Sequence, residues 1–346
     1  MPIRKRKSRK KKSSGVGGAL LAILVAFLLA AGAGAWLVLA PFGSATETFV
    51  ELAPGSSTRQ IGQQLEAAGV IRSQFAFDLT RWWKRGTLRA GEYRFDHAAP
   101  VTEVYARIAR GDVFTKTVVV PEGANIFDIA AKLEQAGLGT RQEFIDTAER
   151  KVGLVADLDP GAKSLEGYLF PDTYRFARKA TPDQIAATMV RRFRAVAGQL
   201  GLKRNVHQLV TLASLVERET AVDTERPMVA SVFENRLAKK MPLGTDPSVI
   251  YGLELAGEWR GAIYKSDLAR DTAYNTYLHQ GLPPGPVANP GVRSLRAAME
   301  PANTDYLYFV AAGANPQGES MFARSLDEQN RNVAGYRSAV KKAGAR

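Results

Sequence analysis

Residues 207–220, HisGlnLeuValThrLeuAlaSerLeuValGluArgGluThr, decide how the second half of this chain folds. Glu217 follows Ala213 by one helical turn, at the edge of an apolar face, whereas Glu219 is expected to point well around the helix. The stretch therefore predicts a helix that packs along one side and carries a carboxylate at the end of that side. The apolar residues recur at the three- and four-residue spacing of a buried helical face: Leu209, Leu212, Ala213 and Val216.

A carboxyl group beside apolar side chains loses hydration of its charged form. Its pKa then rises toward the range in which it can donate a proton near neutral pH. Glu217 is expected to lie in such surroundings. The same residues also fit an ordinary surface helix with two acids, Glu217 and Glu219, two positions apart. The rest of the sequence has to distinguish these two interpretations.

The positive charge of the chain is concentrated at its start. Eight of the 47 Lys and Arg residues fall within residues 1–12, and no acid precedes Glu47. The other 39 basic residues face 34 acidic ones, so the remainder is mildly basic and does not require a nucleic-acid partner. We expect no binding to nucleic acid, because the basic cluster is the flank of the apolar segment that comes directly after it.

That segment, residues 16–40, is apolar and uncharged. It is long enough to cross a bilayer, for which about 20 apolar residues are needed, and longer than a signal-peptide core of about 7–15 residues. The small residues at 31–35 would also suit a signal peptidase, so cleavage there is the alternative. Since basic flanks stay in the cytoplasm, we expect a cytoplasmic tail at 1–15, a single-pass membrane span at 16–40, and an exported remainder.

Missing residue types limit the chemistry that this chain can perform. The sequence contains no cysteine, which excludes disulfides and thiol catalysis. Its three histidines, His97, His207 and His279, form no HisGluXaaXaaHis pair and no visible Ser-His-Asp framework. We therefore expect no metal and no other cofactor, and chemistry that depends on carboxylates, hydroxyls and amides.

Two segments of the first half resemble each other. Each opens with a β-prone run, at 48–52 and 117–120, followed by a helix that stops at a glycine and by a second helix, at 75–84 and 141–150. The residues that recur 68 positions later are Gly55, Ile61, Leu65 and Gly69, which become Gly123, Ile129, Leu133 and Gly137. This periodicity predicts the same small fold twice.

Each segment then closes on Tyr-Arg-Phe, at 93–95 and at 174–176. The second tripeptide lies 81 positions after the first instead of 68, so this copy holds 13 extra residues, around 152–166. The sequence thus predicts a β-α-α-β unit used twice, the second copy merging into the remainder of the second half.

The first copy, within residues 45–115, resembles the LysM module, a small fold that binds glycans containing N-acetylglucosamine. Trp82, Trp83 and Tyr93 could stack on sugar rings there, although aromatic residues at a helix end also serve as core. A spacer that only holds the next domain away from the membrane is the alternative.

Residues 116–346 are expected to form a mixed α/β domain, which makes the fold class α+β overall. Further elements are predicted from periodicity and turn signals: helices at 228–240, near Ser294 and at 325–333, and a strand pair at 305–310 and 321–323. Between them, prolines and glycines fix the backbone of loops at 245–247 and 283–290. TyrAsnThrTyr at 274–277 adds four hydrogen-bonding side chains. Polar and aromatic residues on rigid loops around a helical glutamate are typical of a carbohydrate cleft.

Five motifs, in this order, resemble the endolytic murein transglycosylase family, or YceG-like proteins. They are LeuAlaSerLeuValGluArgGluThr (212–220), ThrAspProSerValIleTyrGly (245–252), TyrAsnThrTyr (274–277), GlyLeuProProGlyPro (281–286) and AsnProGly (289–291). LeuGluGlyTyrLeuPheProAspThrTyr, at 165–174, resembles another motif of the family. The resemblance covers residues 45–340 and includes the single N-terminal membrane anchor and the LysM-like unit.

The resemblance implies an inner-membrane lyase that cleaves nascent peptidoglycan strands internally, between N-acetylmuramic acid and N-acetylglucosamine, and leaves 1,6-anhydro-muramic ends. The family's catalytic glutamate falls on Glu217. This residue would protonate the glycosidic oxygen and then take a proton from the C6 hydroxyl of the same muramic acid. The candidates for substrate binding are Thr245, Asp246, Tyr274, Asn275 and Tyr277. Asp246 would equally cap the turn that it begins.

The implied partners are peptidoglycan strands, the membrane, penicillin-binding proteins and the elongation or division machinery. An activity of this kind could also terminate glycan polymerisation. Two other functions stay open. One is a hydrolytic muramidase in which Glu217 and Asp246 share the work. The other is a non-catalytic glycan-binding scaffold of the wall-synthesis machinery.

Overall fold

The computed structural model describes residues 16–43, 46–315 and 318–344. The predicted cytoplasmic tail, residues 1–15, lies outside these described residues. The chain divides into two compact units, residues 1–115 and 116–346. Each unit has its own cluster of buried apolar side chains.

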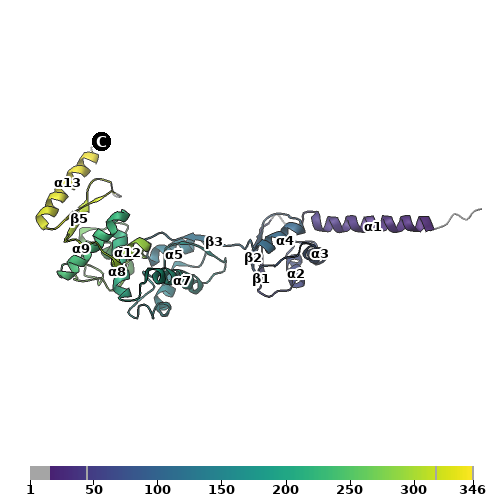
Figure 1. The fold of residues 1–346 in the computed structure, drawn as a ribbon, viewed down its shortest axis with the longest axis horizontal. Coiled ribbons are helices and arrows are strands. Elements are labelled where there is room, and N and C mark those ends of the chain that lie inside the picture. Colours follow the sequence, from purple (N-terminus) through teal and green to yellow (C-terminus); the bar gives the residue numbers. More distant parts are fainter. Residues whose placement is uncertain (1–15, 44–45, 316–317, 345–346) are drawn as a thin grey trace, which may run out of the picture. The chain divides into compact units, whose positions relative to one another are not determined.

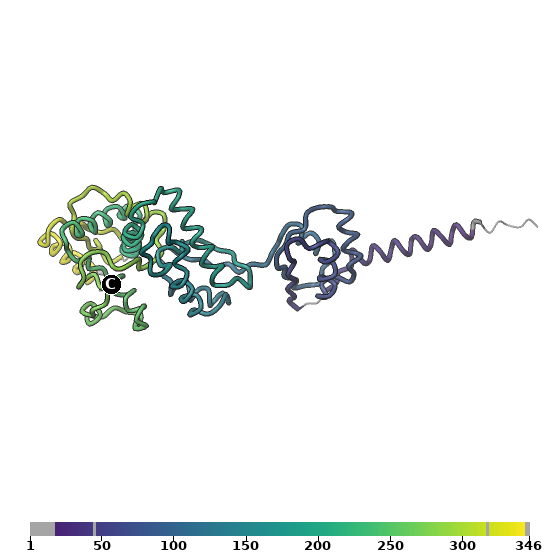
Figure 2. Tube along the Cα trace, turned by 90° about the horizontal axis from the view of Figure 1, so that it is seen from below, coloured from purple at the N-terminus to yellow at the C-terminus, as the bar shows by residue number. Residues whose placement is uncertain are grey.

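The first unit begins with α1 (Val16–Leu39), a single unbroken helix (Figures 1 and 2). Within the described part of the chain, it is the one helix long and apolar enough to cross a membrane, over Gly18–Leu39. Most of its apolar side chains are exposed, but near its end Leu37 packs against the core of the unit and Val38 is part of it. The predicted apolar span is therefore a helix, and it fits a single membrane anchor.

A small α+β body comes next. Its elements are β1 (Thr48–Leu52), α2 (Thr58–Ala67), α3 (Gln74–Lys84), β2 (Gly91–Phe95) and α4 (Val101–Arg110). The two strands pair antiparallel, with Val50 opposite Tyr93. Ser57 caps α2 and Ser73 caps α3, each by accepting a backbone hydrogen bond. The predicted β-α-α-β order is confirmed, but the sequence analysis missed α4, which buries Val104 and Ile108 in the same core.

The second unit opens with a repeat of this arrangement: β3 (Lys116–Val119), α5 (Ile126–Gln135), α6 (Arg141–Arg150) and β4 (Thr173–Phe176). Here Val118 lies opposite Tyr174, at the positions equivalent to Val50 and Tyr93. The predicted internal repeat is thus confirmed in strand register. The extra residues of the second copy form the short helix η1 (Val152–Leu154) and turns that bury Asp159 and Glu166.

The remainder of the second unit is largely helical. It comprises α7 (Pro182–Leu200), α8 (Val206–Glu219), η2 (Asp223–Glu225), α9 (Arg226–Ala238), α10 (Asp246–Leu255), α11 (Lys265–Leu268), α12 (Val292–Met299), β5 (Tyr308–Ala311), β6 (Ser320–Ala323) and α13 (Leu326–Gly344). The predicted helices at 207–220 and 228–240 and the hairpin of β5 and β6 are confirmed. The last helix is longer than predicted.

Two differences from the sequence analysis bear on the site. The predicted loop at 245–247 is instead the start of helix α10, because Thr245 at the N-cap position and Pro247 in the first turn are helix-starting residues. In addition, α8 contacts α9, α10 and α12 (Figure 1). Every residue from Val210 to Val216 is buried. The middle of α8 is therefore covered all round, and not along one face as predicted, whereas Gln208 and Arg218 nearer its ends are exposed.

Candidate active site

Glu217 lies near the end of α8 in a buried ion pair. Its Oε1 accepts a hydrogen bond from Nη1 of Arg226 at 2.8 Å, and its Oε2 accepts one from the backbone N–H of Gly291 at 2.9 Å. The side chains of Glu217 and Arg226 are only 4% and 6% exposed. Both carboxylate oxygens thus already serve as acceptors. The arrangement joins the start of α9 and the AsnProGly loop to α8.

Glu219 is the last residue of α8 and points about 200° away from Glu217 around the helix. Burial raises the pKa of its carboxyl to about 7, and the nearby charge of Asp246 adds to the rise. Arg236 and the Thr245 hydroxyl act in the opposite direction. An acid with this pKa is about half protonated at neutral pH, which suits a group that must donate a proton and later accept one.

Three of the predicted binding residues gather at Glu219. The hydroxyl of Tyr277 donates a hydrogen bond to Oδ1 of Asp246 at 2.7 Å, and Tyr277 is near enough for the charge of Glu219 to help raise its pKa. The backbone N–H of Thr245 donates to Oγ1 of Thr276 at 3.0 Å. Oγ1 of Thr245 is buried and makes no hydrogen bond of normal geometry to the described residues. The start of α10 and the TyrAsnThrTyr loop therefore meet beside Glu219.

Arg236 of α9 completes this group and was missed by the sequence analysis. Its Nη1 donates to the carbonyl of Leu243 at 2.7 Å, and its Nε donates to the carbonyl of Leu307 at 2.6 Å. Burial lowers the pKa of Arg236, while the charges of Tyr308, Glu219 and Tyr277 act against that fall. A single arginine within a helix has no distinctive spacing, so only the fold reveals its place.

Asn275 has a different position from the one expected of a substrate ligand. It is fully buried, and its Nδ2 donates to the carbonyls of Leu268 and Arg270 at 3.0 and 2.7 Å. Its Oδ1 accepts from the N–H of Tyr277 at 3.0 Å. Both ends of the amide are used within its own loop, so Asn275 shapes this loop and presents no free group to an acetamido group.

Tyr274 is half-buried on the same loop. Its ring packs edge-on against Tyr251, with the ring centroids 5.0 Å apart. Burial raises the pKa of Tyr274 to about 12. These contacts give Tyr274 a role in packing the loop on α10.

Two further motifs, LeuGluGlyTyr and AsnProGly, connect the elements that carry the site. Burial raises the pKa of Glu166 to about 8. Its Oε2 accepts from the N–H of Ile126 at 2.8 Å, and its Oε1 accepts from Nδ2 of Asn289 at 2.7 Å. Asn289 in turn accepts from the N–H of Leu169 at 2.8 Å. The LeuGluGlyTyr and AsnProGly motifs thus fix each other and place Gly291 on Glu217.

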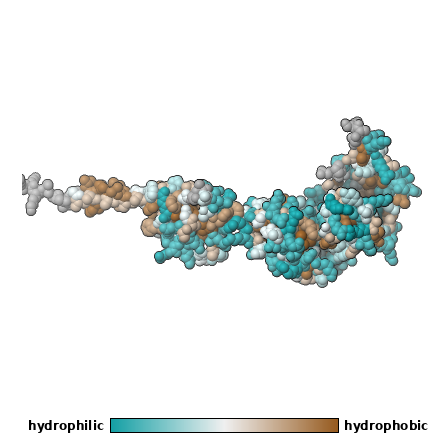
Figure 3. Space-filling view, turned by 180° about the vertical axis from the view of Figure 1, so that it is seen from behind, coloured by the Kyte–Doolittle hydropathy of each residue, from teal (hydrophilic) through white to brown (hydrophobic). Residues whose placement is uncertain are grey.

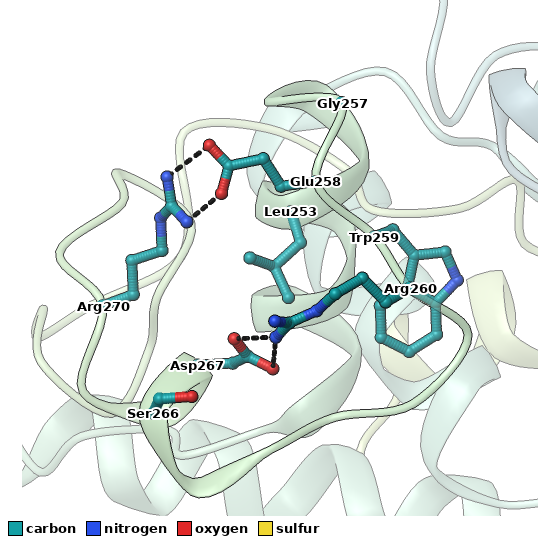
Figure 4. A pocket seen from close by; sticks show the side chains of 8 residues that line it. All are labelled: Leu253, Gly257, Glu258, Trp259, Arg260, Ser266, Asp267 and Arg270. Atoms are coloured by element: carbon teal, nitrogen blue, oxygen red, sulfur yellow. Dashed lines mark hydrogen bonds and ion pairs between the residues drawn. The ribbon is translucent and has the colours of Figure 1, made fainter.

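A separate pocket of about 720 Å³ lies beside α10 and the loop that leads to Tyr274 (Figure 4). Nη2 of Arg260 donates to both carboxylate oxygens of Asp267, at 2.7 and 3.0 Å, and Arg270 is paired with Glu258. Since both guanidinium groups are held by carboxylates, these pairs serve to stiffen the loop. In the described ranges, no group of three or more His, Asp or Glu side chains is arranged to hold a metal ion.

Comparison with known proteins extends over most of the chain. The model of the YceG-like family matches residues 50–335. The endolytic murein transglycosylase of Bacillus subtilis (strain 168) is 33% identical over 317 residues, which are 86% of each chain. That of Streptococcus pneumoniae serotype 2 is 30% identical over 320 residues, 82% of this chain and 57% of the pneumococcal protein. A crystal structure of a YceG-like protein from Listeria monocytogenes matches with a TM-score of 0.54 and 31% identity, over 83% of this chain and 99% of that one.

Proposed function

The chain belongs to the YceG-like family, and on this premise we propose that it is a membrane-anchored endolytic murein transglycosylase. The names of the Bacillus and Streptococcus relatives support this reaction. The proposed cleavage lies within the glycan strand, between N-acetylmuramic acid and N-acetylglucosamine, and leaves a 1,6-anhydro-muramic end. Helix α1 would hold the enzyme in the cytoplasmic membrane, with its catalytic unit on the outer side.

Glu219 takes the catalytic role in this proposal, in place of Glu217. The geometry that carries the choice places the carboxyl of Glu219 beside Asp246, Thr245 and Arg236, where the start of α10 meets the TyrAsnThrTyr loop, and burial there raises its pKa to about 7. Glu217 has the opposite character, because a buried guanidinium and a backbone N–H occupy its two oxygens. A carboxylate bound in this way fits a structural ion pair better than a group that exchanges protons with a substrate.

One carboxyl group is enough for the proposed reaction. Protonated Glu219 gives its proton to the glycosidic oxygen as the bond from that oxygen to C1 of the muramic acid breaks. The resulting carboxylate then takes the proton of the C6 hydroxyl while O6 bonds to C1, so no water is consumed. The acid is thereby restored for the next cycle.

The neighbours of Glu219 support this cycle. The charge of Asp246 raises the pKa of Glu219 and so helps it to hold a proton at neutral pH. Tyr277, which is 38% exposed, holds Asp246 through its hydroxyl and presents an accessible ring edge to a sugar. Thr245 is buried beside Glu219, and its hydroxyl acts on that carboxyl, so we assign Thr245 to positioning the acid for the substrate.

A hydrolytic muramidase is the second candidate, because the charge of Asp246 acts on Glu219 and glycoside hydrolysis uses a second carboxylate. Product analysis separates the two. Mass spectrometry of polymeric peptidoglycan treated with the protein should find anhydro-muramic ends arising from internal positions. Reducing muramic acid ends would favour the hydrolase, and an unchanged polymer would favour the non-catalytic scaffold.

The first unit is proposed to assist by binding glycan, in line with its β-α-α-β order. Tyr93 takes no part in such binding, since it is 1% exposed and its hydroxyl donates to the carbonyl of Arg89. Penicillin-binding proteins and the elongation or division machinery are the proposed protein partners. Termination of glycan polymerisation is the proposed consequence of cleavage near such synthases.

A further inference from the structure

Helix α3 of the first unit is apolar on two faces. One face places Ala76, Phe77 and Thr80 in the core of the unit. The other places four apolar side chains on the surface at the spacing of one helical face: Phe75, Leu79, Trp82 and Trp83, which are 71%, 41%, 73% and 67% exposed. Two adjacent tryptophans with this exposure are unusual on a surface that faces only water. The outer face of α3 therefore requires a partner.

This face lies next to the apolar helix α1. The two helices contact each other, and together they line a groove of about 610 Å³ with almost entirely apolar walls. Small residues of α1, among them Ala31, Gly34 and Ala35, form the wall opposite the aromatic side chains of α3. In Figure 3 the brown surface of α1 is followed by brown patches on the part of the first unit that it joins. The groove is thus continuous with the proposed membrane anchor.

The position of the groove along α1 corresponds to one edge of a bilayer. Its first lining residue, Ala30, precedes the end of the helix at Leu39 by nine residues. Nine residues of helix rise about 14 Å, which is less than half of a hydrocarbon core of about 30 Å. If α1 spans the membrane, the aromatic side chains of α3 lie at the boundary between hydrocarbon and headgroups, where tryptophan is enriched.

Basic residues surround the aromatic ones. Arg81 and Lys84 lie in the last turn of α3, and Arg85 comes directly after them. The guanidinium of Arg72 lies 3.9 Å above the ring of Trp36, near the end of α1. Cations around an apolar aromatic face are complementary to a surface of anionic phospholipid headgroups above acyl chains.

We propose that α3 is an interfacial helix, whose outer face inserts into the outer leaflet of the phospholipid bilayer that holds α1. This inference rests on the membrane anchor of the proposed function. It gives the first unit two attachments to the membrane, and hence one orientation on it. It also assigns Trp82 and Trp83 to lipid, so glycan binding by this unit must use another surface.

The test uses the full chain in vesicles of phosphatidylethanolamine and phosphatidylglycerol. Three variants are made, and each has Phe at all tryptophan positions except those of its reporter. The reporters are the Trp82–Trp83 pair in the first variant, Trp36 in the second and Trp259 in the third. A nitroxide on the lipid acyl chain near the headgroup should quench Trp36 and the Trp82–Trp83 pair, which iodide in the water should not reach. Trp259, on a polar loop of the second unit, is the matched control and should be quenched by iodide instead.

Quenching of the Trp82–Trp83 pair by iodide and not by lipid would overturn the inference. Protection from iodide that appears only after glycan strands are added would also overturn it, since glycan would then cover the outer face of α3. Protection that appears only as the ratio of protein to lipid rises would do the same, since a second copy of the protein would then cover this face. Vesicle flotation and anhydro-end formation are measured on the same samples. Failure to float overturns the anchor and this inference together. Floating, active protein with water-exposed Trp82 and Trp83 overturns this inference alone, and lipid-quenched protein without anhydro ends overturns the reaction alone.

Discussion

The two acids at the end of α8 have different environments, although only Arg218 separates them. Glu217 faces the start of α9 and the loop before α12, where Arg226 and the N–H of Gly291 bind its oxygens. Glu219 faces the start of α10, where Asp246 supplies a like charge. Glu217 therefore connects α8 to α9 and to the loop before α12, and Glu219 is the acid that we propose as the acid–base catalyst.

Glu219→Gln should abolish turnover with little effect on the fold. The amide has nearly the shape of the carboxyl but can neither donate nor take up the proton, and general acid–base groups contribute about 10²–10⁴-fold. Anhydro-ended products and Tm are measured for this variant and for Glu217→Gln. The second variant should lose more stability than activity, because it removes one of the two carboxylates paired with the buried Arg226 and leaves only Asp223, and breaking a buried pair costs up to about 3–5 kcal/mol. A folded but inactive Glu217→Gln with an active Glu219→Gln would restore Glu217 as the catalyst.

The raised pKa of Glu219 predicts a pH dependence of both activity and stability. Activity should fall as pH rises above about 7, since the protonated form is the donor. The folded state holds this proton more tightly than the unfolded chain. The contribution to stability is thus full below the ordinary pKa of 4.5 and is lost as pH rises through about 7. In Glu219→Gln, Tm measured from pH 4 to 8 should fall less steeply than in the unmodified protein. Parallel curves would contradict the assignment.

At the scale of elements, the site depends on loops that are pressed against α8. The LeuGluGlyTyr segment, the loop before α12 and α8 itself meet at Gly167, which has a φ of +85°. A Cβ at this position would lie 2.5 Å from Cγ of Pro286 and 2.7 Å from Cγ1 of Val210. This contact sets how closely the GlyLeuProProGlyPro motif approaches the catalytic helix.

Gly167→Ala should therefore destabilise the second unit and weaken catalysis together. Left-handed backbone strain and overpacking each cost about 1–3 kcal/mol. Gly198→Ala is the matched control, since Gly198 lies in α7 with no atom within 4 Å of an added Cβ and should be neutral or stabilising. Denaturant unfolding and anhydro-end formation are measured for both variants. Equal free energies of unfolding for the two variants would show that the loops around Gly167 can move to accept a Cβ without loss of stability.

At the scale of the whole molecule, each unit has a core of its own. The first core includes side chains of α4, so a boundary inside the first unit, before Val101, would leave this helix without a partner. The second core is contained in residues 116–346 and includes most of α8. A fragment boundary after Thr115 therefore leaves both cores complete.

Residues 116–346 alone should fold and cleave peptidoglycan at high substrate concentration, with a lower kcat/KM. The reason is that Glu219 and all its neighbours lie in the second unit, whereas the first contributes anchoring and the proposed glycan binding. Circular dichroism and product analysis check this expectation. A folded but inactive fragment would mean that the first unit contributes to the reaction itself.

The topology of the full chain should place everything after α1 outside the cytoplasm, because eight basic residues precede the apolar helix. A reporter fused after residue 60 is expected to be active only if it is one that works in an exported location. Activity of a cytoplasmic reporter at this fusion point would reverse the orientation.

Local patterns in the sequence were sufficient to predict much of this protein. Apolar periodicity predicted α1, α8 and the duplicated β-α-α-β arrangement, since helix spacing and capping residues act within a few positions of the chain. The start of α10 was misjudged, because Thr245 and Pro247 suit a turn and a helix start equally well. The ordered motifs predicted the family that the comparisons support.

Only the tertiary structure distinguishes the surroundings of Glu217 from those of Glu219, on which the proposed catalytic role is based. Helical geometry states that two side chains two residues apart point about 200° apart, but not what lies in front of either. The middle of α8 is covered all round, and near its end Arg218 is exposed while Glu219 is half-buried beside Asp246. The groups that set the properties of the two acids, Arg226 and Gly291 for one and Asp246 and Arg236 for the other, reach α8 only through folding. Long-range packing therefore determined the electrostatics of the site.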